Sequence, residues 1–184
     1  IDAKMLRTQK RPTVSGEVSP VAALVISFSL LIVGVAMLYF ASPMAALLGF
    51  LGWFLYVVPY TMWTKRHTVY NTEVGSLSGA MPPLIGWGVV SNDIFHPAII
   101  SLFVIELIWQ MPHFYAIAIR KMEDYRAANV PMLPVAKGMK RTYITTNVYL
   151  VILILCCIPL GSLSTGLMLV AIILSAVWLV LNIY

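Results

Sequence analysis

The sequence predicts an all-α fold, a polytopic bundle of transmembrane helices that forms a single domain over residues 1–184. Of the 184 residues, 60% are hydrophobic and only 10% are charged, and the mean hydropathy is +0.90. Soluble domains are about half apolar and a quarter charged, so this chain belongs in a bilayer. Long uncharged runs support helices, because strands of a membrane barrel would show about ten residues of alternating hydrophobicity.

Six apolar runs define the expected membrane helices. They cover residues 20–40, 42–60, 74–90, 94–119, 142–159 and 163–184. A short corner with a proline separates the first two, which favours an antiparallel helix pair. In the third run, Gly75 and Gly79 permit close helix approach, and Pro82 and Pro83 can break the helix where its backbone lines a cavity.

Charge divides the connections between these runs into two classes. All twelve Lys and Arg residues lie within segments 4–11, 65–66 and 120–141, and the intervening connections carry none. Six spans would therefore place every cation on one face, which the positive-inside rule assigns to a cytoplasmic or matrix side. Asp2, Glu73, Glu123 and Asp124 are expected on the same face, so we expect a surface of mixed charge. Because the cations flank membrane spans, a soluble nucleic-acid-binding module is excluded.

Two mixed-charge clusters on this face suit a metal and a polyanion. In the first, Asp2 precedes Arg7 and Arg11. If this stretch were helical, the two arginines would share a face and could bind a diphosphate bidentately, while the carboxylate is a hard ligand for Mg²⁺. The second cluster covers residues 120–126. If the two clusters converge, they could neutralise a departing diphosphate group, and an apolar cavity could shelter the allyl cation that its departure leaves.

The fourth run carries polar residues despite its hydropathy. Glu106, Gln110 and His113 are spaced by four and three residues, which aligns them on one helical face. An ionisable residue inside a membrane is a functional-site hypothesis, although Glu106 can equally serve as a hydrogen-bond partner of another helix. The imidazole of His113 could meet a porphyrin carboxylate, ligate iron or shuttle a proton, and the sequence leaves these roles open. Candidate aromatic faces for stabilising a cation are Trp63, Tyr70, Trp109 and Tyr115.

Several motifs together resemble the protoheme IX farnesyltransferases (heme O synthases), a branch of the UbiA-like intramembrane prenyltransferases. They lie at residues 4–12, at 60–87 with its Gly79-Ala80-Met81-Pro82-Pro83 core, at Trp109-Gln110-Met111-Pro112-His113-Phe114, at Asp124-Tyr125-Arg126, and at Pro131-Met132-Leu133-Pro134. The resemblance covers most of residues 1–141. It implies nine membrane helices around a central cavity, of which this chain holds about six.

The resemblance also implies a reaction and its participants. Farnesyl would pass from farnesyl diphosphate to a vinyl group of protoheme IX (heme b), giving heme O for terminal oxidases, with Mg²⁺ assisting departure of diphosphate. The expected setting is a bacterial or mitochondrial inner membrane, with the active site towards the cytoplasm or matrix. Heme A synthase or oxidase assembly factors are further expected partners, and nucleic acid is not.

The resemblance assigns roles to particular residues. The catalytic candidates are His113, Lys121 and Asp124. The candidates for binding diphosphate or heme are Arg7, Arg11, Lys65, Arg66, Asn71, Gln110 and Tyr125, and the metal candidates are Asp2, Glu123 and Asp124. The family's first acidic motif would begin before residue 1, so the isolated chain is expected to be inactive.

Two other functions fit parts of the sequence. A related enzyme that prenylates an aromatic acid or quinone precursor would share the charged clusters and differ in its acceptor. A transporter or an assembly scaffold would also carry Glu106 and broken helices. Charge gathered at one face, rather than at the membrane midplane, argues against transport.

Overall fold

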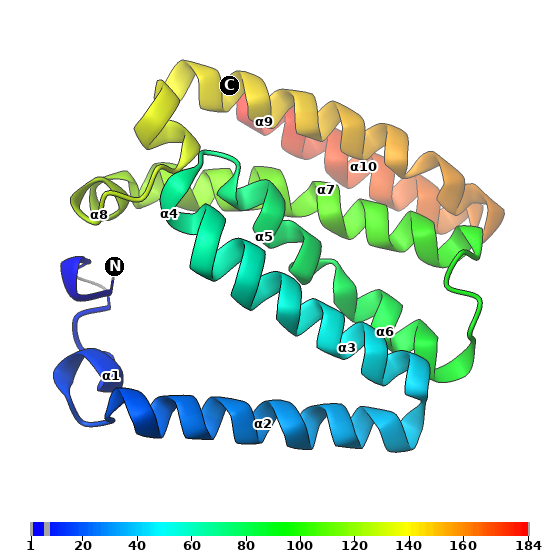
Figure 1. Cartoon of the computed structure of the whole chain (residues 1–184). Helices are drawn as coiled ribbons and strands as arrows, with labels where there is room; N and C mark the ends of the chain where they lie inside the picture. The colour runs from blue at the N-terminus through cyan, green and yellow to red at the C-terminus, as the bar shows by residue number, and fades with distance from the viewer. Residues whose placement is uncertain (1, 6–7, 184) are drawn as a thin grey trace.

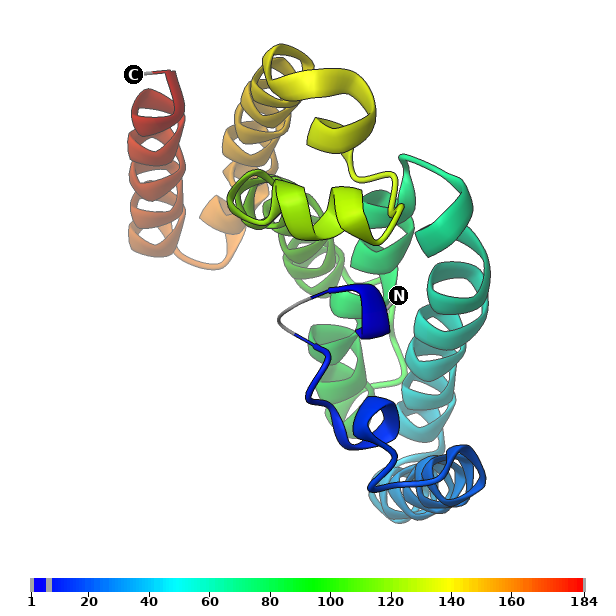
Figure 2. The same ribbon diagram turned by 90° about the vertical axis from the view of Figure 1, so that its left-hand side faces the viewer.

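The computed structural model describes residues 2–5 and 8–183, which form helices and no strands. The long helices run roughly side by side in an arc, with α2 (Pro20–Ala41) at one edge and α10 (Thr165–Ile183) at the other (Figures 1 and 2). Within the described part of the chain, five helical stretches are long and apolar enough to cross a membrane. The all-α membrane bundle predicted from the sequence is confirmed.

Serine-proline pairs create the first hairpin. The Ser19 hydroxyl accepts a hydrogen bond from the Ala22 backbone at 3.1 Å and caps α2. Ser42 caps α3 (Pro43–Leu55) by accepting from the Met44 backbone at 3.2 Å. A proline follows each cap, where its fixed φ suits the first helical turn and its missing N–H removes no helical hydrogen bond. The two helices therefore turn back on each other and pack along their length.

A π-helix extends the second span. The helical turns widen in η2 (Tyr56–Thr64), which contains Pro59, and the chain then continues into α4 (Lys65–His67). Proline offers no N–H to the helix, so the backbone hydrogen-bond ladder is interrupted. The hydroxyl of Thr61 donates to the Tyr56 carbonyl at 2.7 Å, and that of Thr64 to the Pro59 carbonyl at 2.8 Å. Such π-turns are frequent at functional sites.

The third expected span, 74–90, is not one continuous helix. It forms α5 (Asn71–Gly79) and α6 (Met81–Val90), which meet at Ala80. The helix is broken beside Pro82 and Pro83, the two prolines that the sequence marks as able to break it. Pro82 and Pro83 lack the N–H groups that would bond back into α5, and their rings crowd the preceding carbonyls, so the helix must restart. The two halves return alongside α3 (Figure 1).

The remaining helices build the other half of the arc. They are α7 (Pro97–Arg120), α8 (Met122–Ala127), α9 (Leu133–Cys156), η3 (Ile158–Ser162) and α10. α9 begins before the predicted residue 142, but Gly138 has a left-handed φ of 78° and kinks its first turns away from the rest. α7 packs on α5 and α9, and α9 packs on α10.

The cations gather at one end of the bundle, as the charge pattern predicts. The described parts of segments 4–11, 65–66 and 120–141 all lie at the left-hand end in Figure 1, and Arg7 lies outside the described residues. At the opposite end are the connections after α2, α6 and α9, and they contain no Lys or Arg. We call the cation-bearing end the basic end of the bundle.

Candidate active site

A cavity of about 500 Å³ extends from the basic end into the middle of the bundle. The N-terminal segment contributes to its mouth, and α3, η2, α5 and α7 supply its deeper walls. Its lining consists of Asp2, Met5, Arg11, Gly52, Tyr56, Tyr60, Lys65, Asn71, Thr72, Gly75, Ser78, Gly79, Gln110, Phe114, Tyr125, Val130 and Met132. Charged groups thus occur at one end, and aromatic, small and neutral polar groups line the interior.

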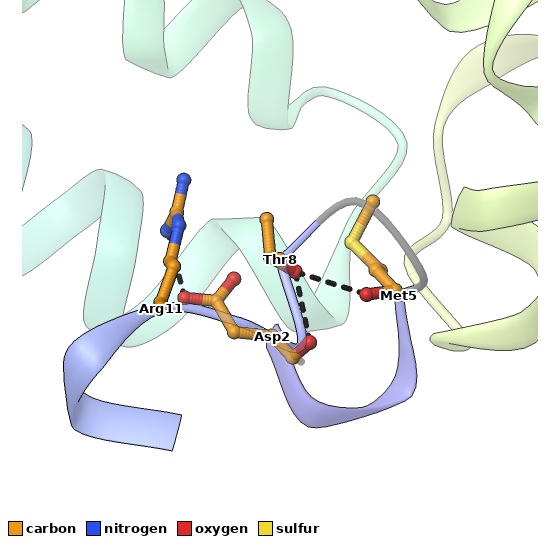
Figure 3. Close-up of polar contacts among 4 residues, drawn as sticks. All are labelled: Asp2, Met5, Thr8 and Arg11. Carbon is orange, nitrogen blue, oxygen red and sulfur yellow. Dashed lines mark hydrogen bonds and ion pairs between the residues drawn. The ribbon is translucent and has the colours of Figure 1, made fainter. Parts of the chain in front are cut away.

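A compact loop places a carboxylate and a guanidinium at the mouth (Figure 3). Arg11 Nη1 donates to Asp2 Oδ2 at 2.7 Å. The buried Thr8 hydroxyl lies 2.8 Å from the Asp2 carbonyl and 3.4 Å from the Met5 carbonyl, and ties the loop together. Both charged side chains stay partly exposed, so the pair contributes little stability, about 0–1 kcal/mol. Its main effect is to hold Arg11 beside the cavity.

The expected helical pairing of two arginines is not formed at Arg11. This residue has extended backbone angles, φ −66° and ψ 140°, and precedes the short helix α1 (Pro12–Ser15). The ring of Pro12 disfavours the helical conformation for the residue before it, which explains the difference. Arg7, the other member of the predicted pair, lies outside the described residues.

The loop packs against the far end of the chain through an apolar cluster. Met5 is 3% exposed and is buried with Ala118, Ala128, Val130 and Met132. The partly buried Tyr125 of α8 packs against the same cluster and lines the cavity. The first and third basic segments are therefore held together by hydrophobic burial. In Figure 2 the N-terminal segment is seen just below the yellow-green α8.

Asn71 joins the second basic segment to the third. Its side-chain amide donates to the Thr68 carbonyl at 2.7 Å and to the Pro131 carbonyl at 3.4 Å. Asn71 is 1% exposed, so these bonds satisfy a polar group that would be costly to bury alone. They hold the start of α5 against the loop before α9 and fix this part of the cavity wall.

Two glycines on α5 create room for the side chains that form the deeper wall. A Cβ added to Gly75 would lie 2.9 Å from Tyr60 Cε2, and one added to Gly79 would lie 2.8 Å from Gln110 Cδ. Gln110 Nε2 donates to the carbonyls of Glu106 at 2.9 Å and Ser76 at 3.3 Å. The small residues therefore admit an aromatic ring and an amide into the cavity wall.

The sequence of the whole chain matches a known protein family. The model of the UbiA prenyltransferase family matches residues 1–184. The chain belongs to the UbiA prenyltransferase family. No solved structure matches it.

Three curated relatives of this UbiA-family chain share one name. "Protoheme IX farnesyltransferase 2" of Lysinibacillus sphaericus (strain C3-41) is 64% identical over 184 residues, which cover 100% of this chain and 58% of that protein. "Protoheme IX farnesyltransferase 1" of Bacillus cytotoxicus is 65% identical over 100% of this chain and 60% of its own length. "Protoheme IX farnesyltransferase 2" of Bacillus subtilis (strain 168) is 47% identical over 99% of this chain and 59% of that protein. The chain thus spans 58% to 60% of the length of these relatives.

The structure brings together some of the sequence-predicted site residues. Those that line the cavity are Asp2, Arg11, Lys65, Asn71, Gln110 and Tyr125. Lys65 Nζ also lies 5.5 Å from the centroid of the Tyr60 ring. Arg66 lines an adjacent groove that shares Asp2 and Lys65 with the cavity. Lys121, at the end of α7, is exposed and does not contribute to the cavity lining.

His113 does not line the cavity, although the residue after it does. Its ring stacks on Trp109 with centroids 5.0 Å apart and an interplanar angle of 13°. Trp109 in turn meets the edge of Trp178 on α10. Phe114 lines the cavity and contacts the edge of the His113 ring, with centroids 5.6 Å apart. The predicted catalytic histidine is therefore one residue removed from the wall, on the side of α7 towards α10.

The described residues provide only part of a Mg²⁺ site. Among them, no group of three or more His, Cys, Asp or Glu side chains could hold a metal, and Asp2 is the single carboxylate in the cavity lining. Glu123 pairs instead with Arg126 at 2.5 Å, and Asp124 lies outside the lining. Mg²⁺ is often held by one or two carboxylates together with substrate phosphates, and Asp2 fits that manner of binding.

Sequence reasoning missed the environment of Glu73. This carboxylate was expected on the mixed surface of the basic end, but it is half-buried between α5, α7 and α9. Its Oε1 accepts hydrogen bonds from the Tyr115 hydroxyl at 2.7 Å and the Tyr149 hydroxyl at 3.4 Å, and its buried Oε2 has no partner in the described structure. Glu73 therefore connects α5, which lines the cavity, to the two helices behind it.

The aromatic residues in the cavity also differ from those expected. Trp63 and Tyr70 are each 66% exposed, and Tyr115 is enclosed in the Glu73 cluster. The cavity is lined instead by Tyr56, Tyr60, Phe114 and Tyr125. The first two lie in η2, whose widened turns could not be recognised from hydropathy.

Proposed function

We propose that the protein containing this chain transfers the farnesyl group of farnesyl diphosphate to a vinyl group of protoheme IX, forming heme O. The observation that carries this proposal is the cavity, which has cations at its mouth and an uncharged interior lined by aromatic, small and neutral polar residues. An isoprenoid diphosphate has the same polarity, with an anionic head and an apolar chain. The shared name of the relatives supports protoheme as the acceptor.

The residues of the mouth would bind and orient the diphosphate. Arg11 offers a planar fork for bidentate contact with phosphate, and Lys65 adds a second positive charge. Asp2 holds Arg11 in place and is the described carboxylate best placed for Mg²⁺. When bound, Mg²⁺ would neutralise charge on the diphosphate. Arg7, Arg66, Lys121, Glu123 and Asp124 remain candidates for contacts that need a rearrangement or other parts of the protein.

The interior would shelter the reacting carbons from water. When the carbon–oxygen bond of farnesyl diphosphate breaks, the electron pair leaves with diphosphate and an allyl cation remains. The protoheme vinyl group then supplies the electrons of the new carbon–carbon bond, and water adds to the carbon beside the porphyrin with release of a proton. The rings of Tyr56, Tyr60 and Phe114 exclude water from the first step, which protects the allyl cation.

We place the protein in the inner membrane of a bacterium, with the cavity mouth towards the cytoplasm. The cations of the described chain lie at the same end as this mouth. The positive-inside rule assigns that end to the cytoplasm, where a water-soluble diphosphate product could leave.

The deciding experiment is mass spectrometry of the heme product. The full-length protein, in liposomes with Mg²⁺, is incubated with protoheme and farnesyl diphosphate. A mass gain of one farnesyl group plus one water is expected, and it should disappear when farnesyl diphosphate is omitted. Prenylation of hydroxybenzoate with unchanged heme would overturn the proposal in favour of a quinone-pathway enzyme.

A further inference from the structure

A second groove lies on the other side of α7 from the candidate active site. Its volume is about 730 Å³, and residues of α7, α9 and α10 line it. Gln110 and Phe114 face the first cavity, whereas Pro112, Ala116 and Ile119 line the second. Helix α7 therefore separates a molecule in this groove from the candidate active site. Such a molecule would not be the acceptor that reacts with the farnesyl group.

The charge of the groove has one sign. Arg120, the last residue of α7, and Lys140, just after the kink of α9, both line it. No Asp or Glu is among the described residues that line it. Neither cation takes part in the ion pairs formed between described residues, which are Asp2–Arg11 and Glu123–Arg126. Two exposed cations at the basic end therefore lack an anionic partner within the described chain.

Away from these cations, the groove combines hydrogen-bonding groups with apolar walls. Asn182 on α10 donates to Asn147 on α9 at 2.6 Å, and both residues line the groove. Trp178 and Leu181 supply apolar surface beside this pair. An occupant would accordingly need an anionic head, polar groups close to that head, and an apolar body.

The groove opens towards the surroundings of the bundle. Two of its lining residues, Ile144 on α9 and Leu181 on α10, are 46% and 72% exposed. Around a bundle that spans a membrane, exposed apolar side chains contact lipid. Basic pockets between membrane helices on the cytoplasmic side bind acidic head groups.

We propose that this groove binds an anionic phospholipid of the leaflet at the basic end. Its phosphate lies between Arg120 and Lys140, its polar head approaches the Asn147–Asn182 pair, and its acyl chains follow Trp178 and Leu181. This site depends on the bundle spanning a membrane and not on the proposed farnesyl transfer. Failure of the heme assay would therefore not affect the proposed lipid site, and failure of the lipid test would not affect the proposed farnesyl transfer.

The test measures lipid retention by the full-length protein. Native mass spectrometry is carried out after release from nanodiscs that contain phosphatidylglycerol or phosphatidylcholine. The wild type should retain phosphatidylglycerol preferentially. A cation near the surface contributes roughly 1 kcal/mol to binding of acidic lipid, so the double variant Arg120→Gln/Lys140→Gln should reduce the preference about thirtyfold. The control Arg126→Gln/Lys137→Gln removes the same charge at the same end outside the groove, and should keep most of the preference.

A second variant separates blocking of the groove from loss of charge. Ala116 lines the groove, and Ala116→Phe should fill it and lower lipid retention without changing the net charge. Equal retention of the two lipids by the wild type would overturn the proposal. So would equal losses in the two double variants, stoichiometric displacement of the lipid by protoheme, or absence of bound lipid because another part of the full-length polypeptide covers the groove.

Discussion

Replacement of Gly79 by alanine tests the close approach of α5 and α7. An added Cβ would lie 2.8 Å from Gln110 Cδ and 3.0 Å from Gln110 Nε2, and closer still to Oε1. Gln110 is only 6% exposed, and its amide donates to two backbone carbonyls. The side chain therefore cannot move away without losing these contacts, although its end is flexible.

The expected change in the free energy of unfolding is the sum of opposing contributions. Loss of the two hydrogen bonds costs about 1 kcal/mol each. Overpacking of a buried site adds about 1 kcal/mol or more. Against this, alanine is favoured over glycine in a helix by up to about 1 kcal/mol. We expect Gly79→Ala to destabilise the protein by about 2 kcal/mol, which lowers Tm of the longer full-length protein by roughly 3 °C.

Thermal unfolding of the purified full-length protein in detergent measures the effect. Gly86→Ala is the matched control, because Gly86 lies in the neighbouring α6 and no heavy atom lies within 4 Å of its added Cβ. This control should leave Tm unchanged or slightly higher. In a Gln110→Ala background the clash disappears, so Gly79→Ala should then be nearly neutral. A Tm for Gly79→Ala equal to that of the wild type, or the same loss in both backgrounds, would refute the proposed contact.

Substitutions at four further positions test the site. Glu73→Ala leaves the Tyr115 and Tyr149 hydroxyls without their acceptor and should lower Tm, since each unsatisfied buried group costs about 1–3 kcal/mol. Glu73→Gln keeps an acceptor and should lower Tm by less. Equal decreases in Tm would contradict this role of Glu73. Arg11→Lys should reduce kcat/KM for farnesyl diphosphate because an ammonium cannot reproduce the guanidinium fork, and unchanged kinetics would remove Arg11 from the diphosphate site. Asp2→Asn should raise the Mg²⁺ concentration needed for half-maximal turnover. The same titration of Asp124→Asn tests whether Asp124 contributes to Mg²⁺ binding. An unaltered curve would mean that Asp124 has a structural role.

Some features of the site could be predicted because they depend on short-range patterns. Pro20 and Pro43 begin helices at the expected corners, and the polar Gln110 within an apolar run lines the cavity. Spacing along a helix determines which side chains share a face, but not which neighbour that face meets. His113 shares the expected stripe with Gln110, yet its ring stacks on Trp109 and lies outside the cavity lining.

Composition and charge order alone determined that this chain is an all-helical membrane bundle with a basic end. Each of these properties sums over many residues, so it tolerates local errors such as the break at Ala80. Only the tertiary structure decided that Asp2, Asn71 and Gln110 share one cavity and that Glu73 is held by two tyrosines. Those contacts join residues from separate segments, and their geometry depends on the packing of several helices, on a π-helix and on the space left by two glycines.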